Sequence, residues 1–423
     1  MYVEIIKRML YNIFNIALYK RKKYKGESKM KLSSRILALA LAVVMAVSVF
    51  AFASCKKDEI EVPKFSEDTI KIGLTGPLTG AAAVYGQAVY NGAKLAVHEI
   101  NEKGGLDGIK FSLEMFDDTH DPTKVATGYA SLIGKGMQIS LGTVTTGPAL
   151  EFKELSKNDN LFVLTPSASG DKVPEYANAF QMCFADGNQG KVAADYVNSL
   201  GKTKIGIFYK TDEDYSKGIY DQFKANLAAG ITTVEASFTD SNATDFSTQI
   251  DTLKDCDFIF MPIYYTPASL FMTQAKDKIA KNATYYGCDG FDGIESAEGF
   301  DITKIPQKVS MLSPFNSKAE SGKAKDFVDK YTELFGKDTL NQFGASAYDC
   351  VYAIFNALKA AKAADSSLVI DGKTTATKLC EILKGQFNGG FTFSGVTGTN
   401  IKWESTGYVN KAAVAYVIKE ANA

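Results

Sequence analysis

Two stretches of the sequence share one form: Gly142-Thr-Val-Thr-Thr-Gly-Pro148 and Thr165-Pro-Ser-Ala-Ser-Gly170. Each comes directly after a short apolar run, at residues 138–141 in the first case and at residues 161–164 in the second. An apolar run that stops abruptly in hydroxyls, glycine and proline is typical of a parallel strand buried on both faces. Open α/β sheets bind their ligands at the carboxyl ends of such strands. The two stretches therefore predict neighbouring strands that end at a binding site.

The first stretch also leads into a helix. An amphipathic pattern extends from near Pro148 to Asn158, and proline is frequent in the first turn of a helix. Thr145 and Thr146 therefore lie where unpaired backbone N–H groups meet the positive end of the helix dipole. Such a place suits one or two carboxylate oxygens. The alternative is that both threonines are ordinary capping and turn residues.

The composition is that of a globular protein. The chain has 423 residues, of which 46% are hydrophobic and 22% charged, and this length accommodates about two domains. The net charge is -1, and lysine and arginine form only scattered runs beyond the N-terminal leader. A nucleic-acid-binding protein would show a basic patch or stripe. We therefore expect a small molecule as the partner and no nucleic acid.

Strands and helices alternate along the chain after residue 68. The first series has strands near residues 70–74 and 111–116 and helices near residues 87–101 and 123–133. A second series extends from residue 179 to residue 286. Short connections between alternating elements predict a parallel, doubly wound sheet. Since the strands fall into two sets, the predicted fold class is α/β with two doubly wound parallel-sheet lobes.

The N-terminal part has the pattern of an export signal. A basic segment begins at Met30, an apolar run follows from Ile36 to Ala53, and small residues precede Cys55. The alternative is a permanent membrane span, for which the run is only marginally long. The end of the run resembles the lipobox of bacterial lipoproteins, in which the cysteine becomes the lipid-modified first residue. We predict a leader at residues 1–54, with Met30 as the true start, lipid attachment at Cys55 and a tether at residues 55–68.

Metal-binding patterns are weak. The cysteines other than Cys55 are widely spaced, form no Cys-x-x-Cys pair and accompany only two histidines, so we expect buried thiols and no zinc site. Asp117, Asp118 and Asp121 are a candidate metal site, but acids placed like these more often end a strand and cap the next helix. We therefore predict no bound metal.

Catalytic patterns are weak as well. No Gly-x-Ser-x-Gly elbow occurs, and Ser167 and Ser169 lack a suitable base because His98 falls within a helix. The segment from Gly128 to Lys135 differs from a phosphate loop in its spacing, and Gly136 stands where a serine or threonine would be needed to reach magnesium. We therefore predict a protein with no catalytic residues and no cofactor.

Several motifs, each weak alone, are specific in their order and spacing. They are Ile70-Lys-Ile-Gly-Leu-Thr-Gly-Pro-Leu-Thr-Gly80, Tyr85-Gly86, Asn101-Glu-Lys-Gly-Gly105, Asp117-Asp118 with Asp121-Pro122, the two hydroxyl-rich stretches, and Tyr215-Ser-Lys-Gly218. Together they resemble the extracellular solute-binding proteins of branched-chain amino acid ABC transporters, the Leu/Ile/Val-binding type. The likeness extends from Ile70 nearly to the end of the chain.

The resemblance implies a type I periplasmic-binding-protein fold. Its two α/β lobes are joined by three crossovers, and the ligand lies in the cleft between them. We place the crossovers near Gly187, Phe315 and Gly398. The predicted first lobe then comprises residues 69–186 and 316–398, and the second comprises residues 187–315 and 399–423.

The resemblance also implies the ligand contacts. Thr146 matches a serine that holds the ligand carboxylate, Ser167 a residue whose backbone carbonyl meets the ammonium, and Ser169 a threonine that bonds the head group. Asp289 matches a glutamate that pairs with the ammonium, and it is one methylene shorter. Phe343 is a candidate wall of the side-chain slot, with a core position at the start of a helix as the alternative. The predicted ligand-binding residues are Tyr85, Thr145, Thr146, Ser167, Ala168, Ser169, Tyr215, Tyr264, Asp289 and Phe343.

These expectations combine into one predicted function. The protein is expected to be a monomeric receptor, lipid-anchored to the outer face of the bacterial cytoplasmic membrane. It would close its lobes on a small amino acid, of the branched-chain class (Leu, Ile or Val), and deliver it to the permease subunits of an ABC transporter. The alternative is a binding or sensor protein of the same fold for another small polar ligand, such as an amide or urea. Asp289 discriminates between the two, because a neutral ligand leaves a buried carboxylate unpaired.

Overall fold

The structure is a computed structural model that describes residues 60–422. The predicted leader, Cys55 with its predicted lipid attachment, and the start of the predicted tether lie outside the described residues. Between residues 60 and 422, no helix is both long enough and apolar enough to cross a membrane.

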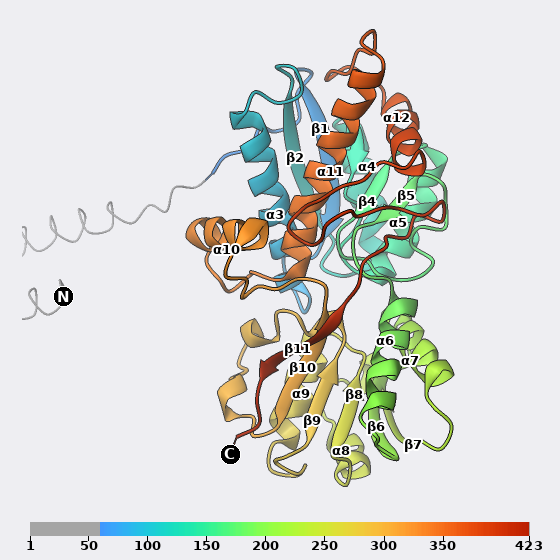
Figure 1. The fold of residues 1–423 in the computed structure, drawn as a ribbon, viewed down its shortest axis with the longest axis vertical. Helices are drawn as coiled ribbons and strands as arrows, with labels where there is room; N and C mark the ends of the chain where they lie inside the picture. The colour runs from blue at the N-terminus through green and yellow to red at the C-terminus, as the bar shows by residue number, and fades with distance from the viewer. Residues whose placement is uncertain (1–59, 423) are drawn as a thin grey trace, which may run out of the picture. The chain divides into compact units, whose positions relative to one another are not determined.

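Two sheets organise the described residues (Figure 1). The first is entirely parallel, with the strand order β2 (Lys110–Asp117), β1 (Thr69–Gly76), β3 (Ile139–Ser140), β4 (Val163–Thr165) and β5 (Ala179–Gln181). The second has the order β11 (Val414–Lys419), β10 (Lys308–Ser313), β9 (Thr284–Gly287), β8 (Phe258–Met261), β6 (Lys204–Lys210) and β7 (Thr232–Phe238). Only the pairing of β10 with β11 is antiparallel.

Helices complete each sheet, and we call a sheet with its helices a lobe. The helices of the first lobe are α3 (Ala83–Glu102), α4 (Val125–Gly134), α5 (Thr146–Asn158), α10 (Gly322–Phe335), α11 (Gln342–Ala364) and α12 (Ala376–Asn388). Those of the second lobe are α6 (Asp186–Ser199), α7 (Asp214–Asn226), α8 (Ser247–Leu253) and α9 (Tyr265–Ala275). The prediction of two doubly wound, parallel α/β lobes is confirmed.

Strand β8 shows why the sheets are covered on both faces. Its four residues are all buried, and successive side chains of a strand point to opposite faces. Phe258 and Phe260 pack in the apolar cluster that contains side chains of α6 and α7. Ile259 and Met261 pack in the cluster that contains side chains of α8 and α9. A continuous apolar run of this kind therefore predicts a strand between two layers of helices.

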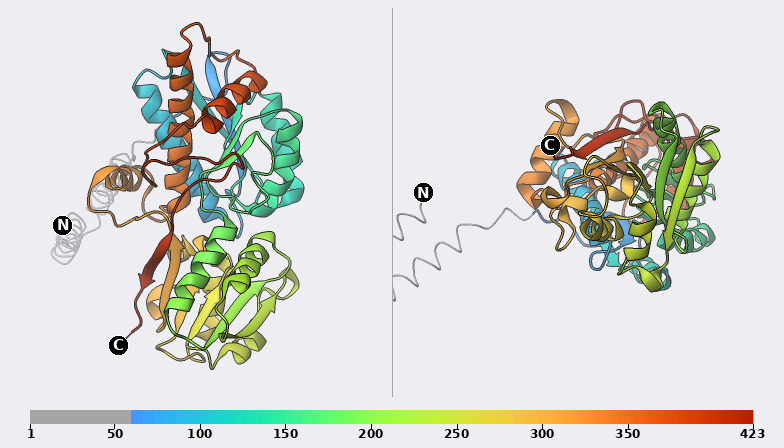
Figure 2. Two further views of the ribbon diagram at one scale, coloured as in Figure 1. Left: turned by 45° about the vertical axis from the view of Figure 1, so that its right-hand side comes forward. Right: turned by 90° about the horizontal axis from the view of Figure 1, so that it is seen from below.

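The C-terminal segment forms the last connection between the lobes along the chain. Residues 393–409 form two isolated antiparallel bridges, and the indole Nε1–H of Trp403 donates to the Gln181 carbonyl of β5 at 2.7 Å. The Trp403 ring lies 4.4 Å from that of Phe387 in α12. Only at β11 does the chain join the second sheet (Figure 2). The sequence-based assignment of residues 399–423 to the second lobe differs from this arrangement, because Trp403 ties the segment to the first lobe.

Helices α3 and α11 pack closely, because glycines face each other at the contact. A Cβ atom at Gly92 of α3 would overlap with the backbone carbonyl of Gly344 in α11. In contrast, a Cβ at Gly218 of α7 would meet no atom within 4 Å. Glycine within a helix otherwise lowers stability, since it loses more backbone freedom on folding than alanine does.

We expect Gly92→Ala and Gly218→Ala to change stability in opposite directions. Gly92→Ala forces two helix backbones apart and should lower the free energy of unfolding by about 1 to 3 kcal/mol. Gly218→Ala meets open space and should raise it by about 0.5 to 1 kcal/mol. Urea unfolding followed by circular dichroism measures both. Equal stabilisation by the two substitutions would show that the helix contact at Gly92 is not close.

Candidate functional site

The structure brings the two hydroxyl-rich stretches into contact. The Thr165 hydroxyl donates to the Thr143 carbonyl at 3.0 Å, and the Gly170 N–H donates to Thr146 Oγ1 at 3.2 Å. Thr145 and Thr146 are each only 2% exposed. Strands β3 and β4 are parallel neighbours, so the segments after them meet at one edge of the sheet. This edge is where doubly wound sheets bind ligands.

Helix α5 presents its N-terminus at this edge. Thr145 is the N-cap residue, with φ of -116° and ψ of 153°, and its side chain makes no capping hydrogen bond. Pro148 has no N–H, so it fits the first turn of the helix without leaving a donor unused. The first N–H groups of a helix have no partner inside the helix and carry its positive dipole end. The end of α5 is therefore suited to an anionic group.

The second lobe contributes a buried carboxyl group. Asp289 follows β9 in a short 3₁₀ turn, η4 (Asp289–Phe291), and is 3% exposed. Its Oδ1 accepts a hydrogen bond from the Tyr215 hydroxyl at 2.7 Å, and its backbone N–H donates to Gln189 Oε1 at 3.0 Å. The Tyr215 ring stacks on that of Tyr264 at 4.4 Å between centroids. A Cβ on Gly290 would lie 2.6 Å from the Tyr215 hydroxyl oxygen, so glycine is required for this contact.

Burial dominates the electrostatics of this carboxyl group. It raises the pKa of Asp289 to about 6, although hydrogen bonds from Tyr215 and Gln189 act in the opposite direction. Burial, together with the negative charge of Asp289, also raises the pKa of Asp186 well above its usual value. Asp186 is 1% exposed, and its Oδ2 has no hydrogen-bond partner among the described residues. Two buried acidic groups whose hydrogen-bond partners are neutral favour a positively charged ligand group in this region.

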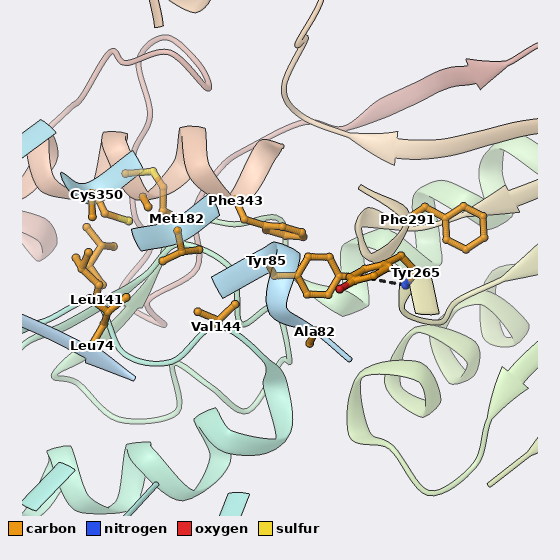
Figure 3. Close-up of a cluster of buried hydrophobic side chains, with 14 of the residues drawn as sticks. Leu74, Ala82, Tyr85, Leu141, Val144, Met182, Tyr265, Phe291, Phe343 and Cys350 are labelled. Atoms are coloured by element: carbon orange, nitrogen blue, oxygen red, sulfur yellow. Dashed lines mark hydrogen bonds between the residues drawn. The ribbon is translucent and has the colours of Figure 1, made fainter. Parts of the chain in front are cut away.

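Tyr85 carries much of the contact between the lobes. It projects from α3 of the first lobe, and its hydroxyl donates to the Gly290 carbonyl and accepts from the Tyr265 N–H at 3.2 Å. Its ring makes edge contacts with Tyr265 at 4.9 Å and Phe343 at 5.1 Å (Figure 3). The Tyr264 ring lies 5.6 Å from that of Tyr85, between centroids. The aromatic side chains of both lobes therefore form one continuous cluster.

The remaining predicted residues lie close to this region. The Ala168 carbonyl accepts a hydrogen bond from Gln181 Nε2 at 3.0 Å, and the Ser169 carbonyl accepts one from the Asp186 N–H at 2.9 Å. Phe343 is 4% exposed at the start of α11, where it belongs to the main apolar cluster and also touches Tyr85. Its place agrees with both interpretations considered from the sequence. The assignment of all ten residues to ligand binding stays a prediction.

Sequence reasoning missed Asp186 and Gln189. Gln189 Nε2 donates to Asp186 Oδ1 at 3.2 Å, while Gln189 Oε1 accepts from Asp289, so Gln189 links the two acidic residues. The local signal was two polar residues three positions apart in the first turn of α6, buried at 1% and 0% exposure. That signal is common at helix N-termini, and only the fold brings it beside Asp289.

Asp117 ends β2 and Asp121 caps the next turn, as predicted from the sequence. Asp117 accepts hydrogen bonds from the Leu78 N–H at 2.9 Å and the Thr79 hydroxyl at 2.7 Å. Asp121 caps a 3₁₀ turn, η2 (Pro122–Lys124), by accepting from the Thr123 N–H at 2.9 Å. Backbone hydrogen bonds of this kind explain the clustering of acids at the end of the strand.

Two α/β lobes that meet over buried hydroxyls, tyrosines and a carboxyl group define a two-lobed ligand-binding protein. A family model described as periplasmic binding protein matches residues 69–421, and the chain belongs to this family. The resemblance noted from the sequence motifs is thereby confirmed.

Relatives of this chain include amino-acid-binding proteins. The Leu/Ile/Val-binding protein BraC3 of Rhizobium johnstonii is 31% identical over 328 residues, which cover 75% of this chain and 88% of that protein. The leucine-, isoleucine-, valine-, threonine- and alanine-binding protein of Pseudomonas aeruginosa is 27% identical over 313 residues, covering 72% of this chain and 82% of that protein.

Among solved structures, the branched-chain amino acid transporter substrate-binding protein LivJ of Streptococcus pneumoniae, in complex with isoleucine, has a TM-score of 0.70. It is 26% identical, and the match covers 83% of this chain and 99% of that chain. The leucine-binding protein LivK of Thermotoga maritima has the same TM-score of 0.70 at 22% identity, and covers 83% and 96% of the two chains. This second likeness shows the shared fold.

The raised pKa of Asp289 leads to a prediction about stability. A carboxyl group whose pKa is higher in the folded state destabilises the fold once the pH exceeds its unfolded value, and the penalty is complete above the folded value, here about 6. Asp289→Asn should therefore raise the free energy of unfolding of the ligand-free protein by about 1 to 3 kcal/mol at pH 7.5. At pH 4 it should change little.

Urea unfolding at the two pH values measures the effect. Asp277→Asn is the matched control, because the Asp277 side chain is 84% exposed and its substitution should leave stability within about 0.5 kcal/mol at both pH values. If Asp289→Asn instead lowers stability equally at pH 4 and pH 7.5, the hydrogen bonds of Asp289 matter more to the fold than the lost hydration of its carboxylate.

Proposed function

We propose that the protein is the solute-binding receptor of an ABC importer and that it binds a small L-amino acid, of the branched-chain class, between its lobes. The observation that carries the proposal is Asp289, a carboxyl group 3% exposed whose hydrogen-bond partners are neutral. The names of the relatives support a branched-chain ligand.

The two ends of a zwitterion fit the two sides of the site. Thr146 and the N-terminus of α5 on the first lobe provide donors for a carboxylate, and Ser169 adds a hydroxyl beside them. Asp289 on the second lobe provides the countercharge for an ammonium. A charge that leaves water without a partner costs several kcal/mol, so a ligand with both charges gains from both lobes.

The aromatic cluster supports an apolar ligand side chain. The rings of Tyr85, Tyr264 and Phe343 come together from both lobes. Tyr85 uses its hydroxyl within the protein, in hydrogen bonds with Gly290 and Tyr265. An aliphatic side chain can pack against these rings without needing a polar partner.

Binding and lobe closure are linked in this proposal. A ligand held by Thr146 on one lobe and Asp289 on the other makes its full set of contacts only when the lobes are together. A ligand shifts a conformational equilibrium by the difference of its affinities for the two states. The closed protein with its ligand is then the form offered to the permease subunits.

Calorimetric titration tests the head-group assignment. We expect L-leucine, L-isoleucine or L-valine to bind, whereas leucinamide and isopentylamine should give no detectable heat of binding. Each analogue lacks the carboxylate and leaves the end of α5 without an anion. Equal affinity for leucinamide would remove the role proposed for Thr146. Release of a urea or a neutral amide from freshly purified, denatured protein, identified by mass spectrometry, would favour the alternative ligand class.

Substitutions on the two lobes refine the same test. Thr146→Ala removes one hydrogen bond to a charged group and should weaken leucine binding by about 1.5 to 3 kcal/mol. Asp289→Asn leaves a desolvated ammonium unpaired and should cost about 2 to 5 kcal/mol. Asp277→Asn should leave affinity unchanged. Leucine binding by the Asp289 variant at the affinity of the unmodified protein would assign Asp289 a structural role only.

We also propose that the protein is exported and anchored by lipid at Cys55. The apolar run from Ile36 to Ala53 and the small residues before Cys55 support this assignment. Labelled palmitate should enter the protein in a bacterial host and be lost in Cys55→Ala. Cys183→Ala is the matched control, because Cys183 is buried and should not affect labelling. Undiminished label in the Cys55 variant would contradict the anchor.

A further inference from the structure

His120, one of only two histidines in the chain, lies where the lobes meet. It follows β2 in a turn where Thr119 and His120 both have positive φ, 53° and 65°. Few residues other than glycine adopt this conformation. A hydrogen bond from the His120 N–H to Asp118 Oδ1, at 2.9 Å, holds the turn. The ring of His120 lies nearly perpendicular to that of Tyr264 from the second lobe, at 5.5 Å between centroids.

Both ring nitrogens of His120 face polar groups. Nδ1 lies 2.8 Å from Thr145 Oγ1, within hydrogen-bond distance. Nε2 lies 3.6 Å from Glu213 Oε1. Thr145 is the N-cap of α5 in the first lobe, whereas Glu213 is the N-cap of α7 in the second. The imidazole therefore connects a hydroxyl at the proposed carboxylate site with a carboxylate on the opposite lobe.

The protonation state of His120 determines what Thr145 can offer. A neutral imidazole has one N–H, and the Glu213 carboxylate favours that proton on Nε2. Nδ1 then accepts the Thr145 hydroxyl proton, and Thr145 presents only lone pairs to a ligand. A protonated imidazole has N–H groups on both nitrogens. Nδ1–H then donates to Thr145 Oγ1, so the Thr145 hydroxyl proton becomes available to a carboxylate.

We propose that His120 is a positioning residue that couples carboxylate binding and lobe closure to the protonation of its imidazole ring. The inference rests on the proposed function, because it requires an anionic group at the start of α5. Closure gives His120 the Glu213 partner, and the bound carboxylate favours the donor form of Thr145. A protonated imidazole makes both contacts at once, with one N–H for each. The ligand should therefore bind more tightly as the pH falls through the range where histidines titrate, about pH 5 to 8.

Other charged groups surround this arrangement. Lys210 Nζ lies 3.5 Å from Glu213 Oε1 and 2.7 Å from Asp240 Oδ1, so Lys210 shares its charge between carboxylates. On the side of the turn, the groups near His120 are Asp118, Asp121 and Lys124, whose Nζ donates to the Thr119 hydroxyl at 2.8 Å. Burial raises the pKa of Asp118 to about 6, as it does for Asp289. A test above pH 6 therefore limits the contribution of these two groups to the pH dependence of leucine binding.

Calorimetric titration of the purified protein with L-leucine at pH 6.5, 7.5 and 8.5 tests the proposal. The dissociation constant should fall about three- to tenfold from pH 8.5 to pH 6.5, because leucine binding and protonation of His120 favour each other. His120→Gln should bind leucine with nearly the same affinity at all three values, close to that of the unmodified protein at pH 8.5. Glu213→Gln should also flatten the profile. His98→Gln, the same change at the other histidine, should keep it.

A nuclear magnetic resonance titration of the two histidine rings gives a second measurement. If His120 had a purely structural role, leucine would leave its titration midpoint unchanged. Saturating L-leucine should raise the titration midpoint of the His120 ring and leave that of His98 in place. Retention of the full pH dependence in His120→Gln, or an unmoved His120 midpoint, would overturn the inference. If His120→Gln does not fold, Glu213→Gln and the ring titration decide. Failure of every amino acid to bind at any pH would overturn the proposed function, and this inference with it.

Discussion

A carboxyl group removed from water without a positive partner is the constraint on which the site depends. Asp289 is held by the Tyr215 hydroxyl and by a turn that requires glycine at position 290. Neutral hydrogen bonds only partly offset the loss of hydration, and the pKa of Asp289 remains raised. The fold therefore maintains an unfavourable arrangement in the second lobe, which a cationic group placed beside Asp289 would relieve.

Local sequence patterns predicted those parts of the molecule that depend on neighbouring residues along the chain. Strand β8 is apolar at every position, and the hydroxyl-rich segments after β3 and β4 are visible as interruptions of apolar runs. The N-terminus of α5 at Thr146 could be located for the same reason. The alternation of strands with helices and the order of the short motifs were enough to predict the fold class.

The parts that could not be predicted depend on contacts between distant residues. Gln189 and Asp289 lie 100 residues apart, and no local pattern indicates that they share a hydrogen bond. His120 reads in sequence as one more polar residue of a turn, and its partner Glu213 belongs to the other lobe. Trp403 shows the same limit, since its bond to Gln181 ties the C-terminal segment to the first lobe well past the predicted crossover.

The position of β11 along the chain determines when the edge of the second sheet can be covered during synthesis. β11 follows β10 along the chain only after α10, α11 and α12, and it pairs with β10 at the edge of the second sheet. A polypeptide made from its N-terminus cannot cover that edge until α10, α11 and α12 have been made. Until then β10 exposes unpaired backbone groups, which are open to pairing with another chain. The second lobe therefore has its greatest need of protection from aggregation while the residues between β10 and β11 are being made.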